Sequence, residues 1–149
     1  MPISSITHRE TPQGNIYAYV SVDVECLFDE FYKPDTPVVS LKSVVERWLA
    51  IRTKDVPLLI DLTGVTAINP LAAGAILSFR SRLAPNGTPD DLVKSHLLVS
   101  LIVTDKSLEN FLVNLHYDRK IRIFKKEELF QRAYDDINNI DIGIRCAEI

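Results

Sequence analysis

Two nearly continuous apolar segments constrain the fold of this chain more than any other feature. Residues 56–62 and 97–103 are almost entirely aliphatic, have the length of a β-strand, and are each followed by an apolar pattern of helical period. A strand that is apolar on both sides has to be covered on both sides, which is typical of central strands in parallel sheets. The two segments therefore predict an α/β fold built from strand-to-helix units.

Further elements flank these two segments. Strand-like residues on either side of the Pro/Gly/Asn cluster at 11–15 predict a hairpin, whereas 24–32 are compatible with either a short helix or a packed loop. Helices are expected from Pro37 to about Arg52, over 70–83, after Thr104 or Asp105 as N-cap, and from 127 onward, with a short strand over 121–124. This order predicts a mixed β-sheet of about five strands, with about four helices lying largely on one side and right-handed crossovers.

Length, charge and hydropathy limit the classes of protein to which this chain can belong. The 149 residues contain no internal repeat or linker, so we expect a single domain over 1–149. The net charge is -3 and basic residues form only small clusters, which argues against a nucleic-acid partner. No apolar stretch reaches the length of a membrane span and the first residues lack a secretory signal. We therefore expect a cytoplasmic protein.

Residues that perform catalysis or bind metals are not grouped in the sequence. The three histidines have no metal-binding spacing, and Cys26 and Cys146 belong to no C-x-x-C motif. Carboxylates occur as sequence neighbours, which point apart on a helix, and both glycine-rich phosphate-binding motifs are missing. We therefore expect no enzyme activity, no cofactor and no metal ion.

One strand-to-helix connection has a distinctive sequence. Residues 59–83 read Leu-Ile-Asp-Leu-Thr-Gly-Val-Thr-Ala-Ile-Asn-Pro-Leu-Ala-Ala-Gly-Ala-Ile-Leu-Ser-Phe-Arg-Ser-Arg-Leu. This stretch resembles the signature of STAS domains, the family of sulphate-transporter C-terminal domains and anti-sigma factor antagonists. The matching positions are Asp61, Thr63, Gly64, Val65, Ile68, Gly74, Ile76 and Leu77. The similarity runs from about residue 5 to 138 and implies a STAS-like sheet and a non-enzymatic regulatory function.

The chain departs from that family at the residue that is phosphorylated. In the antagonists, the second serine of the turn, at the start of the helix, accepts a phosphoryl group from a partner kinase. This chain has Leu71 there, preceded by Asn69 and Pro70. Leucine has no hydroxyl group, so the usual switch cannot operate at this position, although a phosphosite displaced to Thr66 or Ser78 stays open. In addition, His116 replaces a glycine that is common before the short strand.

Two functions from different classes follow. The first is protein–protein interaction at the N-terminal end of the 70–83 helix, where Ala73 and Leu77 form a second apolar face; an equally weighted reading is that both faces are buried. The partner-binding residues would be Thr66, Asn69, Pro70, Leu71, Ala73 and Leu77. The resemblance implies an anti-sigma factor, a serine kinase or other STAS-containing subunits as the partner. The alternative is a sensor that binds a small ligand, an anion or a nucleotide at the turn 63–74, although Pro70 removes one amide donor.

The tail at 139–149 alternates with period two. Ile140, Ile142 and Ile144 fall on one side, which predicts an extra half-buried strand. A lone strand is not stable in water, so it would pair with a sheet edge of its own chain or with the matching edge of a second copy. Of the two, we expect the second, a homodimer.

Overall fold

The computed structural model describes residues 3–27, 41–52, 56–83, 98–117 and 121–147. The side chains of Leu71 and of 138–147 lie outside that description. Of the segment 24–32, the structure places Cys26–Leu27 as a short strand, and 28–32 lie outside the described residues.

The main sheet has five strands, as predicted. They are β1 (Thr7–Glu10), β2 (Ile16–Ser21), β4 (Leu58–Asp61), β6 (Val99–Ile102) and β7 (Arg122–Phe124), in the order β1-β2-β4-β6-β7. β1 and β2 form the expected antiparallel hairpin, whereas the other neighbours pair in parallel. A second sheet pairs β3 (Cys26–Leu27) with β5 (Ala67–Ile68). The predicted mixed α/β architecture is confirmed.

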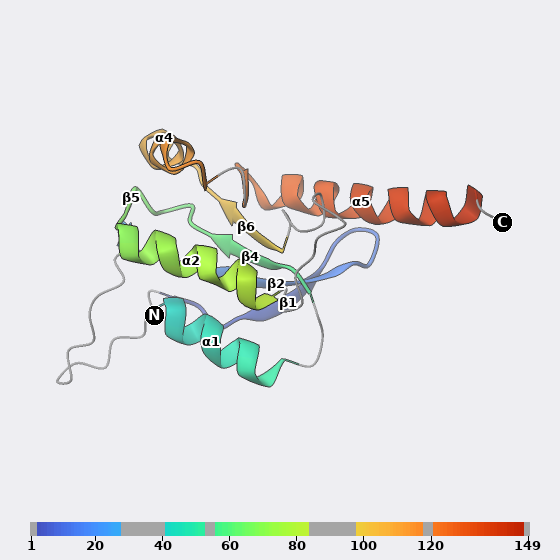
Figure 1. The fold of residues 1–149 in the computed structure, drawn as a ribbon, viewed down its shortest axis with the longest axis horizontal. Helices are drawn as coiled ribbons and strands as arrows, with labels where there is room; N and C mark the ends of the chain where they lie inside the picture. The colour runs from blue at the N-terminus through green and yellow to red at the C-terminus, as the bar shows by residue number, and fades with distance from the viewer. Residues whose placement is uncertain (1–2, 28–40, 53–55, 84–97, 118–120, 148–149) are drawn as a thin grey trace.

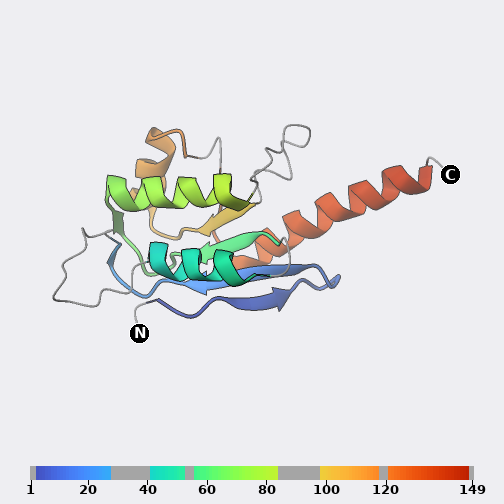
Figure 2. The same ribbon diagram turned by 60° about the horizontal axis from the view of Figure 1, so that its bottom comes forward.

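Helices cover both faces of this sheet (Figures 1 and 2). They are α1 (Leu41–Ile51), α2 (Pro70–Leu83), α4 (Lys106–Asn114) and α5 (Glu127–Ala147). α1 and α2 lie side by side, and the C-terminal part of α5 extends beyond the sheet in both views. The helix expected over 70–83 therefore has the bounds that the sequence predicts.

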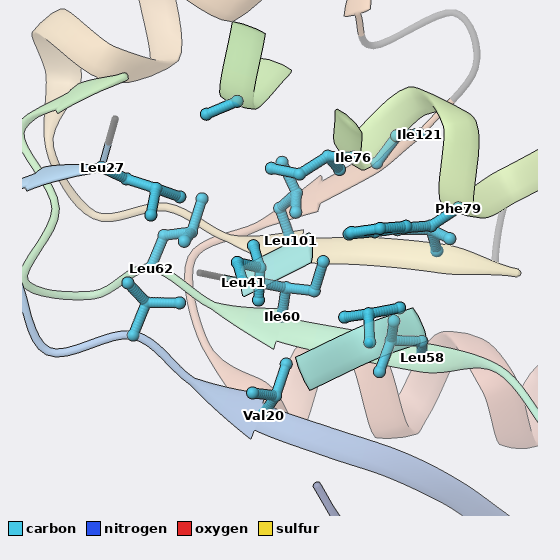
Figure 3. Packing of buried hydrophobic residues seen from close by; sticks show 14 of the residues in the cluster. Val20, Leu27, Leu41, Leu58, Ile60, Leu62, Ile76, Phe79, Leu101 and Ile121 are labelled. Atoms are coloured by element: carbon cyan, nitrogen blue, oxygen red, sulfur yellow. The ribbon is translucent and has the colours of Figure 1, made fainter. Parts of the chain in front are cut away.

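The larger of two hydrophobic clusters lies between the sheet and α1, α2 and α4. Figure 3 shows strand residues such as Ile60 and Leu101 facing Ile76 and Phe79 of α2. Because side chains alternate along a strand, Leu59 and Ile102 point to the opposite face, where they form a smaller cluster with Tyr17, Phe124 and Phe130. Apolar contacts on both faces explain why 56–62 and 97–103 are continuously apolar.

The position of α5 differs from the simplest reading of the sequence. α1, α2 and α4 contribute to the larger cluster, as expected for helices lying largely on one side. α5 contributes Phe130 to the smaller cluster, so it covers the other face. The sheet is thus enclosed between two helical layers of unequal size.

The prediction of an extra strand in the tail is wrong. The backbone from Glu127 to Ala147 is one α-helix. The reason is that Ile137, Ile140 and Ile144 also lie at i, i+3 and i+7, and so continue the apolar stripe begun by Phe130 and Tyr134. No proline interrupts this stripe. A homodimer built on a tail strand is therefore ruled out by the geometry, and a homodimer of another kind stays a proposal.

Candidate functional site

The connection between β4 and α2 lies where parallel strands end. β4 ends at Asp61 and α2 begins at Pro70, so residues 62–69 sit at the carboxyl edge of the sheet, beside the end of β6. In open α/β sheets, this edge is where ligands and partners usually bind. We call residues 61–73 the β4–α2 connection.

Hydrogen bonds to the segment before β3 hold the middle of this connection. The amides of Thr66 and Ala67 donate to the carbonyl oxygen of Glu25 at 2.8 and 3.3 Å, and the Thr66 hydroxyl donates to the same oxygen at 3.2 Å. The amide of Asn69 donates to the Leu27 carbonyl oxygen at 3.3 Å. These bonds extend the β3–β5 pairing and fix the backbone just before the helix.

The carboxylate of Asp61 organises the start of the connection. Its Oδ1 accepts hydrogen bonds from the amide of Thr63, at 3.0 Å, and from the Thr63 hydroxyl. Its Oδ2 accepts the phenol of Tyr19 at 2.5 Å. From the neighbouring strand end, the Thr104 hydroxyl donates to the Thr63 carbonyl oxygen at 2.7 Å. Thr63 is therefore held by both its amide and its carbonyl group.

The protonation state of the Tyr19 phenol is consistent with its hydrogen bond to Asp61. Burial, followed by the hydrogen bond to Asp61, raises the pKa of the Tyr19 phenol well above its ordinary value of 10.0. The phenol therefore stays protonated at neutral pH and remains a donor to Asp61.

The start of α2 is capped by the side chain that the sequence places there. Oδ1 of Asn69 accepts the amide of Ala72 at 2.8 Å, and the Asn69 carbonyl oxygen accepts the amide of Ala73 at 3.1 Å. Pro70 is the first helical residue, where its fixed φ and missing N–H are tolerated best. The Asn-Pro pair thus acts as a helix start signal.

The predicted site residues divide into exposed and buried positions. Thr66 and Pro70 are exposed and Asn69 is half-buried. Leu71 is the second residue of α2, and its side chain lies outside the described part. Leu77 is half-buried and packs against the larger cluster. Ala73 has only 4% of its surface exposed.

Ala73 is therefore wrong as a partner-binding residue. It belongs to the larger cluster, and its carbonyl oxygen accepts the phenol of Tyr117, itself 2% exposed, at 3.0 Å. Tyr117 follows α4 in the chain and packs in that same cluster. The second apolar face of α2 is thus largely internal, and the exposed outer face of this helix carries Gly74 and Ser78 instead.

Sequence reasoning missed two groups that hold the connection. The Tyr19 phenol and the Glu25 carbonyl oxygen come from segments about 40 positions earlier in the chain. The alternation of Tyr17 and Tyr19 in β2 places both rings on the α5 side of the sheet, which is the side of the Asp61 carboxylate. That alternation is the signal from which the contact could have been found.

The geometry argues against anion binding at the turn. The amides of Thr63, Val65, Thr66, Ala67, Asn69, Ala72 and Ala73 each donate to an oxygen of the chain itself. Pro70 has no amide hydrogen. A helix N-terminus binds an anion through amides that are free, so little donor capacity is left in the described backbone.

Two further properties concern the described residues alone. They contain no group of three or more His, Cys, Asp or Glu side chains that are placed to hold a metal ion. None of their helices has both the length and the apolar character needed to cross a membrane.

Comparison with known proteins gives a similarity to solved structures. No protein-family model and no curated protein matches the chain. A solved structure is similar: an uncharacterized protein from the DUF3478 family with a SpoIIAA-like fold, from Shewanella loihica PV-4. The two are 18% identical over 89% of this chain and 91% of that chain, with a TM-score of 0.44.

Proposed function

We propose that the chain is a non-enzymatic protein–protein interaction module of STAS type, which binds its partner through the β4–α2 connection. The observation that carries the proposal is that this connection is both exposed and held in place. Thr63, Gly64, Thr66 and Pro70 are exposed. The backbone of Thr63 is bound by Asp61 and Thr104, and that of Thr66 by Glu25. A surface that is ordered before binding loses less conformational entropy on association.

The outer face of α2 extends the proposed surface. Gly74 and Ser78 follow Pro70 at intervals of four residues and are exposed, so they share one helix face with it. The Ser78 hydroxyl donates to the carbonyl oxygen of Ala75 at 2.6 Å, so its short side chain is folded back onto the helix. A partner helix or loop can approach such small residues closely. This surface fits the partners that the family resemblance implies, which are an anti-sigma factor, a serine kinase or another STAS-containing subunit.

The proposal includes a loss of regulation by phosphorylation at the family position. Leu71 and Pro70 have no hydroxyl group. Incubation with a candidate partner kinase and ATP, followed by mass spectrometry, should leave residues 66–78 unmodified. A phosphate on Thr66 or Ser78 would contradict this loss of regulation and indicate a phosphorylation switch at a displaced residue.

Arginine substitutions test the surface. Thr66→Arg and Ser78→Arg place a large charged side chain on exposed positions. Ser78→Arg should leave the free energy of unfolding within about 0.5 kcal/mol of wild type, whereas Thr66→Arg also removes the hydroxyl bond to Glu25 and should cost about 0.5–1.5 kcal/mol. Both should weaken binding to the candidate STAS or kinase partner at least tenfold in calorimetry. Ile51→Arg is the matched control, because Ile51 is 73% exposed at the far end of α1.

Two outcomes would refute the proposal. Equal binding by wild type and both site variants would place the interface elsewhere. Saturable binding of a nucleotide or inorganic phosphate, with an affinity that Thr66→Arg changes, would favour the sensor instead.

A further inference from the structure

A row of side-chain contacts connects α5 with the β4–α2 connection. It starts at Glu127 in the first turn of α5, whose Oε2 and Oε1 lie 2.8 and 2.9 Å from Nη1 of Arg9 on β1. The Arg9 guanidinium carbon lies 3.6 Å from the centre of the Tyr19 ring on β2. Tyr19 donates to Asp61, and Asp61 accepts the amide and hydroxyl of Thr63. We call these five side chains the back-face row.

The strand register explains why these side chains meet. Arg9 pairs with Tyr17, and Tyr19 pairs with Leu59, so residues of odd number on β1, β2 and β4 share one face. That face is the one covered by α5. Asp61 lies two residues beyond Leu59, so its carboxylate points to the same side while its backbone leads into the connection.

Each contact in the row depends on the position of both side chains, so that a displacement of one side chain alters its contact with the next. The Arg9–Glu127 pair involves both carboxylate oxygens, and a guanidinium stacked on an aromatic ring adds a cation–π attraction. The Glu127 carboxylate also accepts the Tyr17 phenol at 2.5 Å, and Gln131 Nε2 donates to that phenol at 2.7 Å. The first two turns of α5 are therefore tied to β1 and β2 by polar contacts.

The start of the row is open to other molecules. Arg9, Tyr17, Glu127 and Gln131 line a groove of about 600 Å³, together with Glu10, Lys126 and Glu128. The Arg9 and Glu127 side chains keep 44% and 25% of their surface exposed. A charged group that enters the groove can compete for either member of the pair.

We propose that the first turn of α5 regulates the β4–α2 connection through the back-face row, with Tyr19 as the positioning residue. The inference rests on the proposed function in one respect only, that the β4–α2 connection is the surface that binds the partner. The coupling itself belongs to the free chain. A change in the Arg9–Glu127 pair alters the Tyr19 ring position, hence the Tyr19–Asp61 hydrogen bond, and so the order of Thr63.

Amide hydrogen exchange of the ¹⁵N-labelled full chain tests the coupling. Tyr19→Phe removes the hydroxyl and keeps the ring under Arg9, so exchange of the Thr63 amide should be about two- to tenfold faster, the factor that one lost hydrogen bond supplies. Glu127→Gln removes the charge opposite Arg9 and should also speed exchange at Thr63, without touching that residue. In the double variant, the two effects should combine to less than their product, because the row is interrupted only once.

Asn15→Ala is the matched control. It removes another contact between α5 and the β1–β2 hairpin, the 2.6 Å hydrogen bond from Asn15 Nδ2 to Asp135, which is not part of the row. It should leave exchange at Thr63 unchanged.

Several outcomes would overturn the coupling. Unchanged exchange at Thr63 in Glu127→Gln would show that α5 does not reach the connection. The contacts of the row would be local and uncoupled if the effects of Tyr19→Phe and Glu127→Gln multiplied in the double variant. The same would follow if Asn15→Ala sped exchange at Thr63 equally. Should Tyr19→Phe fold poorly, the comparison of Glu127→Gln with Asn15→Ala still decides. Partner binding is not part of this readout, so a failure of the proposed function would appear only in the calorimetry of the arginine variants.

Discussion

The packing of α5 on the second face of the sheet makes Phe130 the most informative position for a stability test. Phe130 is 0% exposed and is the helix residue at the centre of the smaller cluster. Its ring centre lies 5.0 Å from that of Tyr17 and 5.9 Å from those of Phe124 and Tyr134, and the first two pairs are edge-to-face. Truncating it leaves a cavity bounded by three aromatic rings.

The expected cost follows from two contributions. Removing a buried phenylalanine side chain costs about 3–5 kcal/mol for lost transfer energy and the remaining cavity. That range already includes the lost aromatic contacts, and two edge-to-face pairs, of about 0.5–1.5 kcal/mol each, place Phe130 in its upper part. Phe130→Ala should therefore lower the free energy of unfolding by about 4–5 kcal/mol, the upper part of the range. Leu129→Ala, on the next residue, which is 38% exposed, should cost less than about 0.5 kcal/mol.

Urea unfolding followed by two signals measures this cost. Trp48 is the single tryptophan, it lies on α1, and it belongs to the larger cluster on the opposite face. Its fluorescence reports that cluster, while far-ultraviolet circular dichroism reports the helices on both faces. One shared sheet predicts coincident transitions for both signals.

Two results would refute this reasoning. A cost below about 1 kcal/mol for Phe130→Ala, or an equal cost for Leu129→Ala, would mean that α5 is not packed as described. A loss of circular dichroism well before Trp48 fluorescence changes would mean that α5 unfolds as a separate unit.

Four further predictions concern single features. Asn69→Ala removes the cap of α2 and should cost about 0.5–2 kcal/mol in urea unfolding. His116 has a φ of 57°, a left-handed conformation that glycine adopts without strain. His116→Gly should therefore stabilise the chain by about 0.5–1 kcal/mol, which is the strain relieved minus the extra conformational entropy that glycine loses on folding. Burial, with the Glu127 hydrogen bond, raises the pKa of Tyr17 from 10.0 to about 12. The protonated phenol's contribution to the free energy of unfolding is therefore complete below pH 10 and is lost as the pH rises towards 12. In urea unfolding at pH 10 to 12, the stability of Tyr17→Phe should fall less than that of wild type. A homodimer formed through the projecting end of α5 should become a monomer in light scattering when 139–149 are deleted; a monomeric full chain, or a dimer that survives deletion, would contradict it.

Local signals carried the successful part of the sequence reasoning. The bounds of α2 were predictable because Asn69, Pro70 and the stripe that includes Ile76 and Phe79 are all written within one helix length. The hairpin was predictable because its turn residues lie between two strand-like segments.

Long-range contacts account for the rest. Whether Ala73 is buried depends on Tyr117, which comes from beyond α4 and whose position no periodicity in 70–83 reveals. The anchoring of the connection depends on Glu25 and Tyr19, which meet Thr66 and Asp61 only after the sheet has formed. Asp61 and Thr63 belong to the recognisable motif, but their partners do not, so the motif located the site without showing what holds it.

The helical tail also changes what a homodimer would require. Three isoleucines at 140, 142 and 144 satisfy a period of two, but a strand so short carries less information than a stripe that runs from Phe130 through Ile137 for several turns. Gly143 costs a helix only about 1 kcal/mol relative to alanine, which a long continuous helix tolerates. Neither edge strand of the sheet is suited to pairing. All four residues of β1 are exposed and two of them, Arg9 and Glu10, are charged, and β7 has only 3 residues and begins with the exposed Arg122. Any self-association that depends on 139–149 must therefore involve the projecting end of α5 rather than an edge of the sheet.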